Sequence, residues 1–306
     1  VALFNDFDAS LLFDIPAGDA LGASTFMPMG WYGIWAALPF AMWLFLAVEG
    51  VPLAAEEAEN PEKDIPKGII AAMLFLLISA VLVVVLVAGT AGAQAMGQSA
   101  VPLVDALKAT GNTNLAVAVN VLGLAGLIAS FFSIIYGYSR LVFALSRAGY
   151  LPKFLSLTSQ RKAPTWALIV PGVFGFLASL SGEGDLMLAM AVVGATISYA
   201  LMALSHILLR IKEPNMPRPY KTPGGTVTSS TALILSLVAL TGVYAYDPRA
   251  FGFTLALYAL GACYFFFYSK NNLVAKTAEE EFALLAAAEQ ELEQDDEEQK
   301  PEPQLA

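Results

Sequence analysis

One carboxylate stands at the end of an apolar segment, beside residues that break helices. Glu49 directly follows the uncharged stretch 31–48 and is followed by Gly50 and Pro52. Glycine weakens a helix and proline removes a backbone donor, so we expect the helix to break here and to resume over 53–58. A carboxylate at membrane depth is costly, which makes Glu49 a candidate functional residue. It could pair with a cationic substrate or carry a coupled proton; the structural alternative is a cap on the second half-helix.

The predicted break could form a binding site with an aromatic side chain above it. A broken helix is tolerated in a membrane only where it is buried or lines a cavity, and such breaks hold substrates in secondary transporters. Trp43 lies six residues before Glu49, and its ring could close over an ammonium group by cation–π contact. The alternative for Trp43 is packing or anchoring at the membrane interface. We interpret Trp35, nearer the start of the segment, as part of an aromatic belt at that interface.

Several polar residues lie in the middle of other apolar segments. Ser130, Ser133 and Ser198 stand among glycines and alanines, where serine serves helix packing or contacts a substrate or ion. His206 lies near the end of another apolar segment, where it is either a hydrogen-bonded structural residue or a proton relay.

Acidic residues crowd the segment after the break. Glu56 and Glu57 precede the turn marked by Asn60 and Pro61. We interpret the two glutamates as part of an inner gate, ion-paired to other loops.

The composition excludes most classes of protein. Of the 306 residues, 57% are apolar and only 14% are charged, with a mean hydropathy of +0.65, whereas soluble domains carry roughly 25% charged residues. One Cys and one His exclude a disulfide scaffold and a conventional zinc cluster. The 16 basic residues against 26 acidic ones argue against a nucleic-acid partner. The sequence contains no HExxH or GxSxG motif that would indicate an enzyme, and no cofactor is expected.

Seven apolar stretches are long enough to cross a membrane, which takes about 20 residues. None of them contains Lys, Arg, Asp or Glu. They run over 31–48, 69–93, 115–139, 163–182, 186–209, 226–246 and 250–269. The fold class predicted is therefore an all-α integral membrane protein with seven transmembrane helices.

The basic residues predict how these helices are oriented. Lys and Arg collect in alternate loops and in the C-terminal tail, and only Lys108 and Arg249 fall on the other side. By the positive-inside rule, the N-terminal end lies outside and the tail lies in the cytoplasm. An odd number of spans with an outside N-terminal end, and no signal peptide, fits a chain whose earlier helices are missing.

Charge also separates the body of the chain from its ends. Residues 277–306 hold 11 acidic residues and one basic residue, while the other 276 residues hold 15 of each. We therefore interpret 271–306 as an acidic cytoplasmic tail, either a solvated extension or a docking site for a regulator. Residues 1–30 are expected to form an extracellular loop, and 101–108 a short helix within a second one.

Three motifs resemble the amino acid–polyamine–organocation superfamily. FLAVEGVPLAAEEAENPEKDIPKGI resembles its sixth helix, YGYSRLVFALSRAGYLPKF its eighth helix with the following loop, and LLRIKEPNMPRPYKTPGG its tenth-to-eleventh loop. Their order and spacing match the superfamily over nearly all of the chain except the tail. Within it, AVEGVPLAAEE and GYSRLVFALSRAGYLP are most similar to ethanolamine permeases.

The resemblance implies twelve helices, of which two inverted repeats of five form the core. This chain would then hold helices six to twelve: 31–210 as the second inverted repeat and 211–270 as the two extra helices. Residues Val48, Glu49, Gly50 and Val51 would line the substrate site from the unwound sixth helix. Trp43 matches the aromatic gate, and Glu49 matches an acidic position implicated in proton sensing.

The sequence thus predicts a secondary transporter of a small organic amine, with ethanolamine as the first choice. Alternating access in the plasma membrane, with H⁺ as the coupling ion, is the expected mechanism. The alternatives are an amino acid or polyamine permease of the same superfamily and a transport-inactive sensor or scaffold. The expected partners are the amine, the coupling ion and the lipid bilayer, with no nucleic acid.

Overall fold

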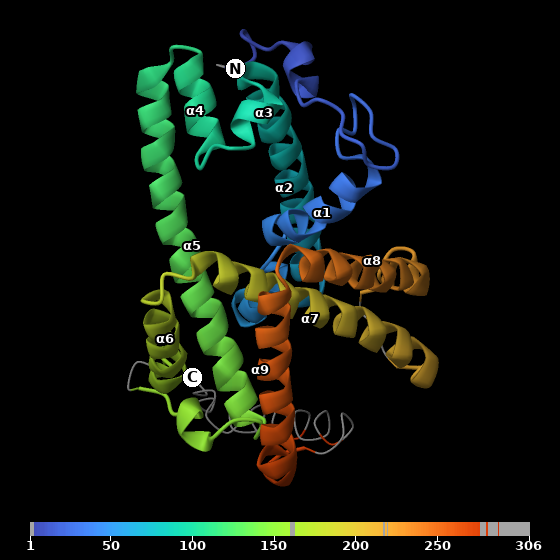
Figure 1. Cartoon of the computed structure of the whole chain (residues 1–306). Helices are drawn as coiled ribbons and strands as arrows, with labels where there is room; N and C mark the ends of the chain where they lie inside the picture. Colours follow the sequence, from blue (N-terminus) through green and yellow to red (C-terminus); the bar gives the residue numbers. More distant parts are fainter. Residues whose placement is uncertain are drawn as a thin grey trace, which may run out of the picture. The chain divides into compact units, whose positions relative to one another are not determined.

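The computed structural model describes residues 3–159, 163–216, 218, 220–275, 280 and 287, and it does not describe the side chains of residues 49 and 54–57. Within these residues, every regular element is a helix (Figure 1). The α-helices are α1 (Gly30–Leu44), α2 (Pro61–Ala91), α3 (Ala93–Met96), α4 (Pro102–Ala109), α5 (Thr113–Arg147), α6 (Thr165–Ser179), α7 (Gly184–Lys212), α8 (Gly225–Tyr246) and α9 (Pro248–Phe267). The 3-10 helices are η1 (Ala9–Phe13), η2 (Val48–Glu57), η3 (Lys153–Ser156) and η4 (Ser269–Asn271).

Five helices are long and apolar enough to cross a membrane: α2, α5, α7, α8 and α9, the last continued to Asn271. The other two predicted spans are shorter. Both α1 and α6 have 15 residues, or about 22 Å at ~1.5 Å per residue, against about 30 Å of hydrocarbon. The prediction of membrane-spanning helices is therefore confirmed for five of the seven stretches, and in the other two the apolar sequence continues beyond the point where the helical backbone ends.

The helices form two compact units. Unit 1 comprises residues 1–134 and 177–257, and unit 2 comprises 135–176 and 258–306. Helices α5, α6 and α9 each contribute to both units, and each unit is described separately below.

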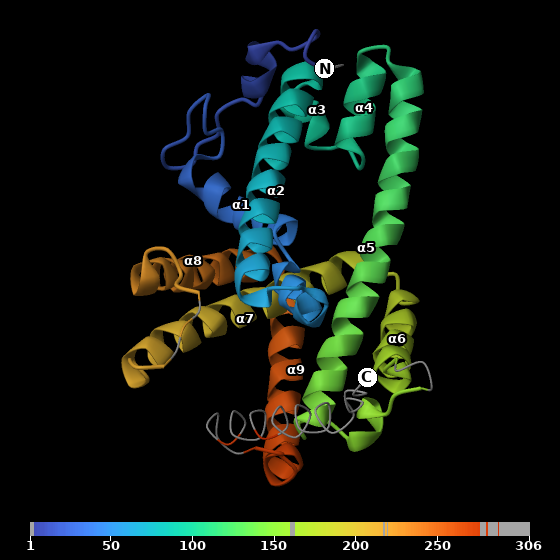
Figure 2. The same cartoon turned by 180° about the vertical axis from the view of Figure 1, so that it is seen from behind.

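In unit 1, α7 and α8 lie side by side and α1 packs against both (Figures 1 and 2). The core of this group consists of Val192, Val193 and Val243, all buried. Met42 and Leu46, from the end of α1 and the segment after it, pack against these valines. Burying apolar side chains between helices stabilises the group, so the end of α1 is held by α7 and α8.

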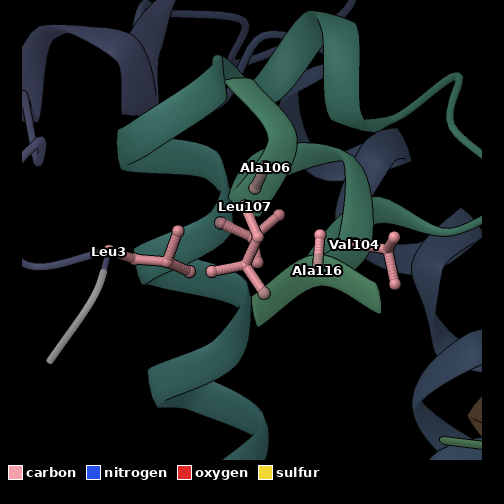
Figure 3. Packing of buried hydrophobic residues seen from close by; sticks show 6 residues of the cluster. Leu3, Val104, Ala106, Leu107 and Ala116 are labelled. Carbon is pink, nitrogen blue, oxygen red and sulfur yellow. The ribbon is translucent and has the colours of Figure 1, made fainter. Parts of the chain in front are cut away.

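A second cluster in unit 1 fixes the end of α2 (Figure 3). Leu3, Val87, Val104, Leu107 and two alanines are buried together there. A polar contact also holds the N-terminal segment, because the backbone N–H of Gln94 donates to a carboxylate oxygen of Asp14 at 2.9 Å. The short helix predicted over 101–108 is found as α4 and supplies part of this cluster.

In unit 2, the loop after α5 is joined to the end of α9. Ser269 Oγ donates to the carbonyl oxygen of Tyr150 at 2.7 Å, and the Val274 amide donates to that of Ala148 at 3.1 Å. Gly149 between them has φ +87, and a Cβ there would overlap the carbonyl oxygen of Asn272. We call the contact between residues 148–150 and 269–274 the clasp.

Asp247 sets the junction between α8 and α9. One of its carboxylate oxygens accepts the backbone amides of Arg249 at 2.9 Å and Ala250 at 3.3 Å. Loss of surrounding water acts to raise the pKa of Asp247, but the amides of Ala250 and Arg249 and the Arg249 guanidinium outweigh it and hold this pKa below its ordinary value.

Replacing Asp247 with alanine is expected to destabilise the protein by about 1 kcal/mol at neutral pH, the usual cost of losing a helix cap. Because the folded-state pKa is lowered, the stabilisation is full above the unfolded-state pKa and is lost as the pH falls through the folded-state value. Thermal unfolding of wild type and Asp247→Ala should therefore differ at pH 7 and converge in strong acid. Asp247→Asn, which can still cap the helix, is the control; convergence at neutral pH would contradict the prediction.

Candidate functional site

The apolar segment predicted to break does so between α1 and η2. The α-helix ends at Leu44, where the Phe45 amide bonds to the Met42 carbonyl and the Leu46 amide to that of Trp43, tightening the last turn. Ala47 then takes φ +69 and, among the described residues, is the one non-glycine residue with a positive φ. Such a backbone costs of order 1 kcal/mol in alanine and collects at functional sites.

The position of the break corrects the sequence-based prediction. The helix was expected to run to Val48 and to break at Glu49–Pro52, but it ends four residues earlier, and Gly50 and Pro52 lie inside η2. The backbone after Ala47 winds as a 3-10 helix of 10 residues, which is long, since runs beyond about 3–4 residues are uncommon and often mark hinges or strain.

Two helix ends meet at this break. Part of each end is already bonded, because the carbonyls of Met42 and Trp43 accept from the amides of Phe45 and Leu46, and the Gly50 amide donates to the Ala47 carbonyl at 3.0 Å. A carbonyl oxygen has two lone pairs, so those at the end of α1 can accept a further hydrogen bond. The carbonyl end carries a partial negative charge and the amide end a partial positive charge. The break thus offers acceptors for an ammonium group and donors for a carboxylate within one short segment.

Three of the residues predicted to line the site lie next to the break. Val48, Gly50 and Val51 are half-buried in η2. The side chains of Glu49, Glu56 and Glu57 lie outside the described part of the structure.

Trp43 belongs to the last turn of α1 and is 46% exposed. Its neighbours Met42 and Leu46 face the valine core formed with α7 and α8. The Trp43 ring therefore lies outside the valine core, and its role as an aromatic gate stays a prediction.

The three serines are not joined to the break. Ser130, Ser133 and Ser198 are exposed, and no hydrogen bond between described residues links them to Trp43. Ser133 Oγ donates to the Ala129 carbonyl of its own helix at 3.1 Å. The buried hydroxyl near Ser198 is that of Thr196, which donates to the Val192 carbonyl at 2.7 Å.

His206 is hydrogen-bonded between two helices. Its Nδ1 lies 2.7 Å from Ser229 Oγ, a hydrogen bond that joins α7 to α8.

Sequence reasoning missed a contact that positions α1. Trp35 was assigned to an interfacial belt, but its indole Nε1–H donates to Thr241 Oγ1 on α8 at 2.9 Å. A signal for close approach was present in α8, where the small residues Ser236, Ala239 and Gly242 recur at a spacing of three. Small residues on one helix face let a second helix come near.

Comparison with known proteins matches most of the chain to one family. The model described as "Amino acid permease" matches residues 4–280. The branched-chain amino acid permease BcaP of Bacillus subtilis is 31% identical over 69% of this chain and 46% of the relative. The aromatic amino acid transport protein AroP of Salmonella typhimurium is 29% identical over 67% of this chain and 47% of the relative.

A human relative gives the same result. The cystine/glutamate transporter of Homo sapiens is 32% identical over 76% of this chain and 45% of its own length. The chain thus spans about half the length of the curated relatives it matches. With its all-helical fold and five apolar helices of membrane-spanning length, the chain belongs to the amino acid permease family of multi-pass membrane transporters, within the amino acid–polyamine–organocation superfamily.

Proposed function

We propose that the full product of the gene encoding this chain is a secondary transporter of a neutral amino acid, which works by alternating access. The observation that carries the proposal is the break between α1 and η2, where a carbonyl end and an amide end face one short segment. A zwitterion carries both an ammonium group and a carboxylate, so it can use both ends. Ethanolamine carries only the ammonium, and the relatives' printed names favour an amino acid over it.

In this proposal the backbone of Val48, Gly50 and Val51 orients the amino acid. Trp43 closes over it, and Ser130, Ser133 and Ser198 reach it in other states of the transport cycle. These three serines are exposed on α5 and α7, and the Ser133 hydroxyl would have to leave the Ala129 carbonyl to bind a substrate.

Glu49 is proposed to carry the coupled proton, since it is the acidic residue nearest the break. Glu56 and Glu57 form the inner gate. The protein lies in the plasma membrane with the tail in the cytoplasm, an orientation supported by the distribution of Lys and Arg.

Uptake of labelled amino acids into a transport-deficient host, expressing the full product of the gene, tests this function. We expect saturable uptake of a neutral amino acid that collapses when a protonophore removes the proton gradient. Excess ethanolamine and polyamines should not compete.

Two results would overturn the proposal. Ethanolamine uptake that resists amino acid competition would restore the amine substrate. Binding of amino acids without uptake would favour a transport-inactive sensor. A host carrying the empty vector controls for endogenous uptake.

A further inference from the structure

Helix α1 contacts α8 from Trp35 to the end of the helix. Trp35 donates a hydrogen bond to Thr241. One and a half turns later the ring of Phe40 meets that of Tyr246 edge-on, with centroids 5.2 Å apart. At its end Met42 packs against the core that contains Val243. We call this contact the α1–α8 seam.

The closest approach in the seam is at Gly242, which is buried. A Cβ at this position would lie 2.9 Å from the carbonyl oxygen of Trp35 and 3.6 Å from Leu38 Cβ. Pro39, also buried, lies beside the same point. The two helices can therefore come this close only because residue 242 has no side chain.

The hydrogen bond next to Gly242 fixes the register of the two helices. Thr241 Oγ1 accepts from Trp35 Nε1 at 2.9 Å and donates to the carbonyl of Val238 at 2.6 Å. Both functions of the hydroxyl are used, so its direction is set by α8 itself. A fixed acceptor on α8 thus holds one side chain of α1 in place.

The seam ends where the candidate site begins. Trp43 is on the last turn of α1, and the break follows directly. A shift of α1 against α8 would therefore move Trp43 and the carbonyl end of the break.

We propose that α8 positions the substrate-facing end of α1, with Gly242 and Thr241 as positioning residues, and that the two helices move as one body during transport. The inference rests on the proposed function, because it assigns the seam a role in the site at the break. Closely packed surfaces shift as units rather than deform continuously, which is why a seam of this kind travels whole.

The first test compares two glycine substitutions. Gly242→Ala places a methyl group against the Trp35 carbonyl, whereas Gly252→Ala on α9 meets open space. We expect Gly242→Ala to raise the KM for amino acid uptake about tenfold with Vmax per molecule of surface protein nearly unchanged, since misplacement by about 1 Å can cost ~100-fold in activity. Gly252→Ala should match wild type. Equal kinetics for the two variants would overturn the positioning role.

A second pair of variants keeps the test informative if Gly242→Ala does not reach the membrane. Thr241→Val removes the hydroxyl with little change in volume, and Thr241→Ser retains it. Only the valine variant should raise KM, and Trp35→Phe combined with it should add nothing further. Identical KM values for the valine and serine variants would contradict the inference.

Cross-linking tests whether the helices move together. In a Cys263→Ser background, Phe40→Cys and Tyr246→Cys are joined by a short bifunctional thiol reagent, with each single cysteine as control. We expect the double variant to cross-link, and its uptake after cross-linking to equal that of the same variant without the reagent. Absence of cross-linking, or uptake lost only on cross-linking, would overturn the one-body proposal.

The cross-linking yield also separates this inference from the proposed function. If the wild-type protein takes up no amino acid, the proposed function fails, while the seam is still tested by the yield without substrate. Gly242→Ala should lower that yield and Gly252→Ala should not. An unchanged yield would overturn the seam whatever the protein transports.

Discussion

Replacing Gly149 with alanine is expected to lower the free energy of unfolding of unit 2 by about 3 kcal/mol or more. Two costs combine at this position. The backbone φ of +87 is unfavourable for alanine, and the new Cβ would overlap the carbonyl oxygen of Asn272. Relief of the overlap requires the clasp to open, which removes the hydrogen bonds from Ser269 to Tyr150 and from Val274 to Ala148.

Gly111→Ala is the matched control. Gly111 has a similar φ of +75 but no heavy atom within 4 Å of a built Cβ. It should show only the cost of the left-handed backbone, about 1 kcal/mol. Thermal unfolding of the detergent-purified protein should give a clearly lower Tm for Gly149→Ala than for Gly111→Ala. Equal Tm values would show that the clasp adds nothing to stability.

The Glu49→Gln variant is expected to lose concentrative uptake about 10- to 100-fold, the range that corresponds to removing one hydrogen bond to a charged group. Glutamine keeps the shape of the side chain but cannot release a proton. If Glu49 carries the coupled proton, exchange of internal for external substrate should survive, since it needs no net proton movement. The residual uptake should no longer change with pH.

Glu59→Gln provides the comparison for Glu49. Glu59 is exposed and lies beyond η2, so its variant should retain both uptake and pH dependence. Initial rates of uptake and of exchange in proteoliposomes, each over a range of pH, separate the two activities. Uptake by Glu49→Gln equal to wild type at every pH would remove Glu49 from both substrate binding and proton coupling.

The sequence predicts most membrane helices well, because the signal for them is local. The uncharged stretch from 69 to 93 corresponds to α2, which begins earlier, at Pro61, where proline is well tolerated, and ends at Ala91. Likewise the stretches 226–246 and 250–269 correspond to α8 and to α9 with its continuation. Hydropathy measures how apolar a segment is, and in these segments the helix covers nearly all of the apolar stretch.

The same signal fails at the end of α1. Phe45, Leu46 and Val48 continue the apolar stretch, yet the backbone leaves the α-helix before them. Hydropathy cannot report the positive φ of Ala47. Glycine and proline did indicate the correct segment, but a 3-10 helix accommodates both Gly50 and Pro52, so the interruption falls before them.

The parts of the site that depend on distant residues could not be predicted. Trp35 and Thr241 are separated by 206 positions in the chain, and no local pattern pairs an indole with one particular hydroxyl. The length of α6 was also overestimated, since its apolar sequence runs beyond Ser179 into a turn at Gly182. The ethanolamine preference carried by the motif resemblance is also not supported by the relatives described above, which are named as amino acid transporters.

The clasp has a consequence for biosynthesis. Ser269 is made 119 residues after Tyr150, so the ribosome needs about 6 to 24 s to supply the partner at ~5–20 residues per second. During this interval the loop after α5 has been translated, whereas residues 269–274, which complete the clasp, have not. Synthesis of α6, α7 and α8 therefore precedes closure of unit 2, which waits for the residues that follow α9.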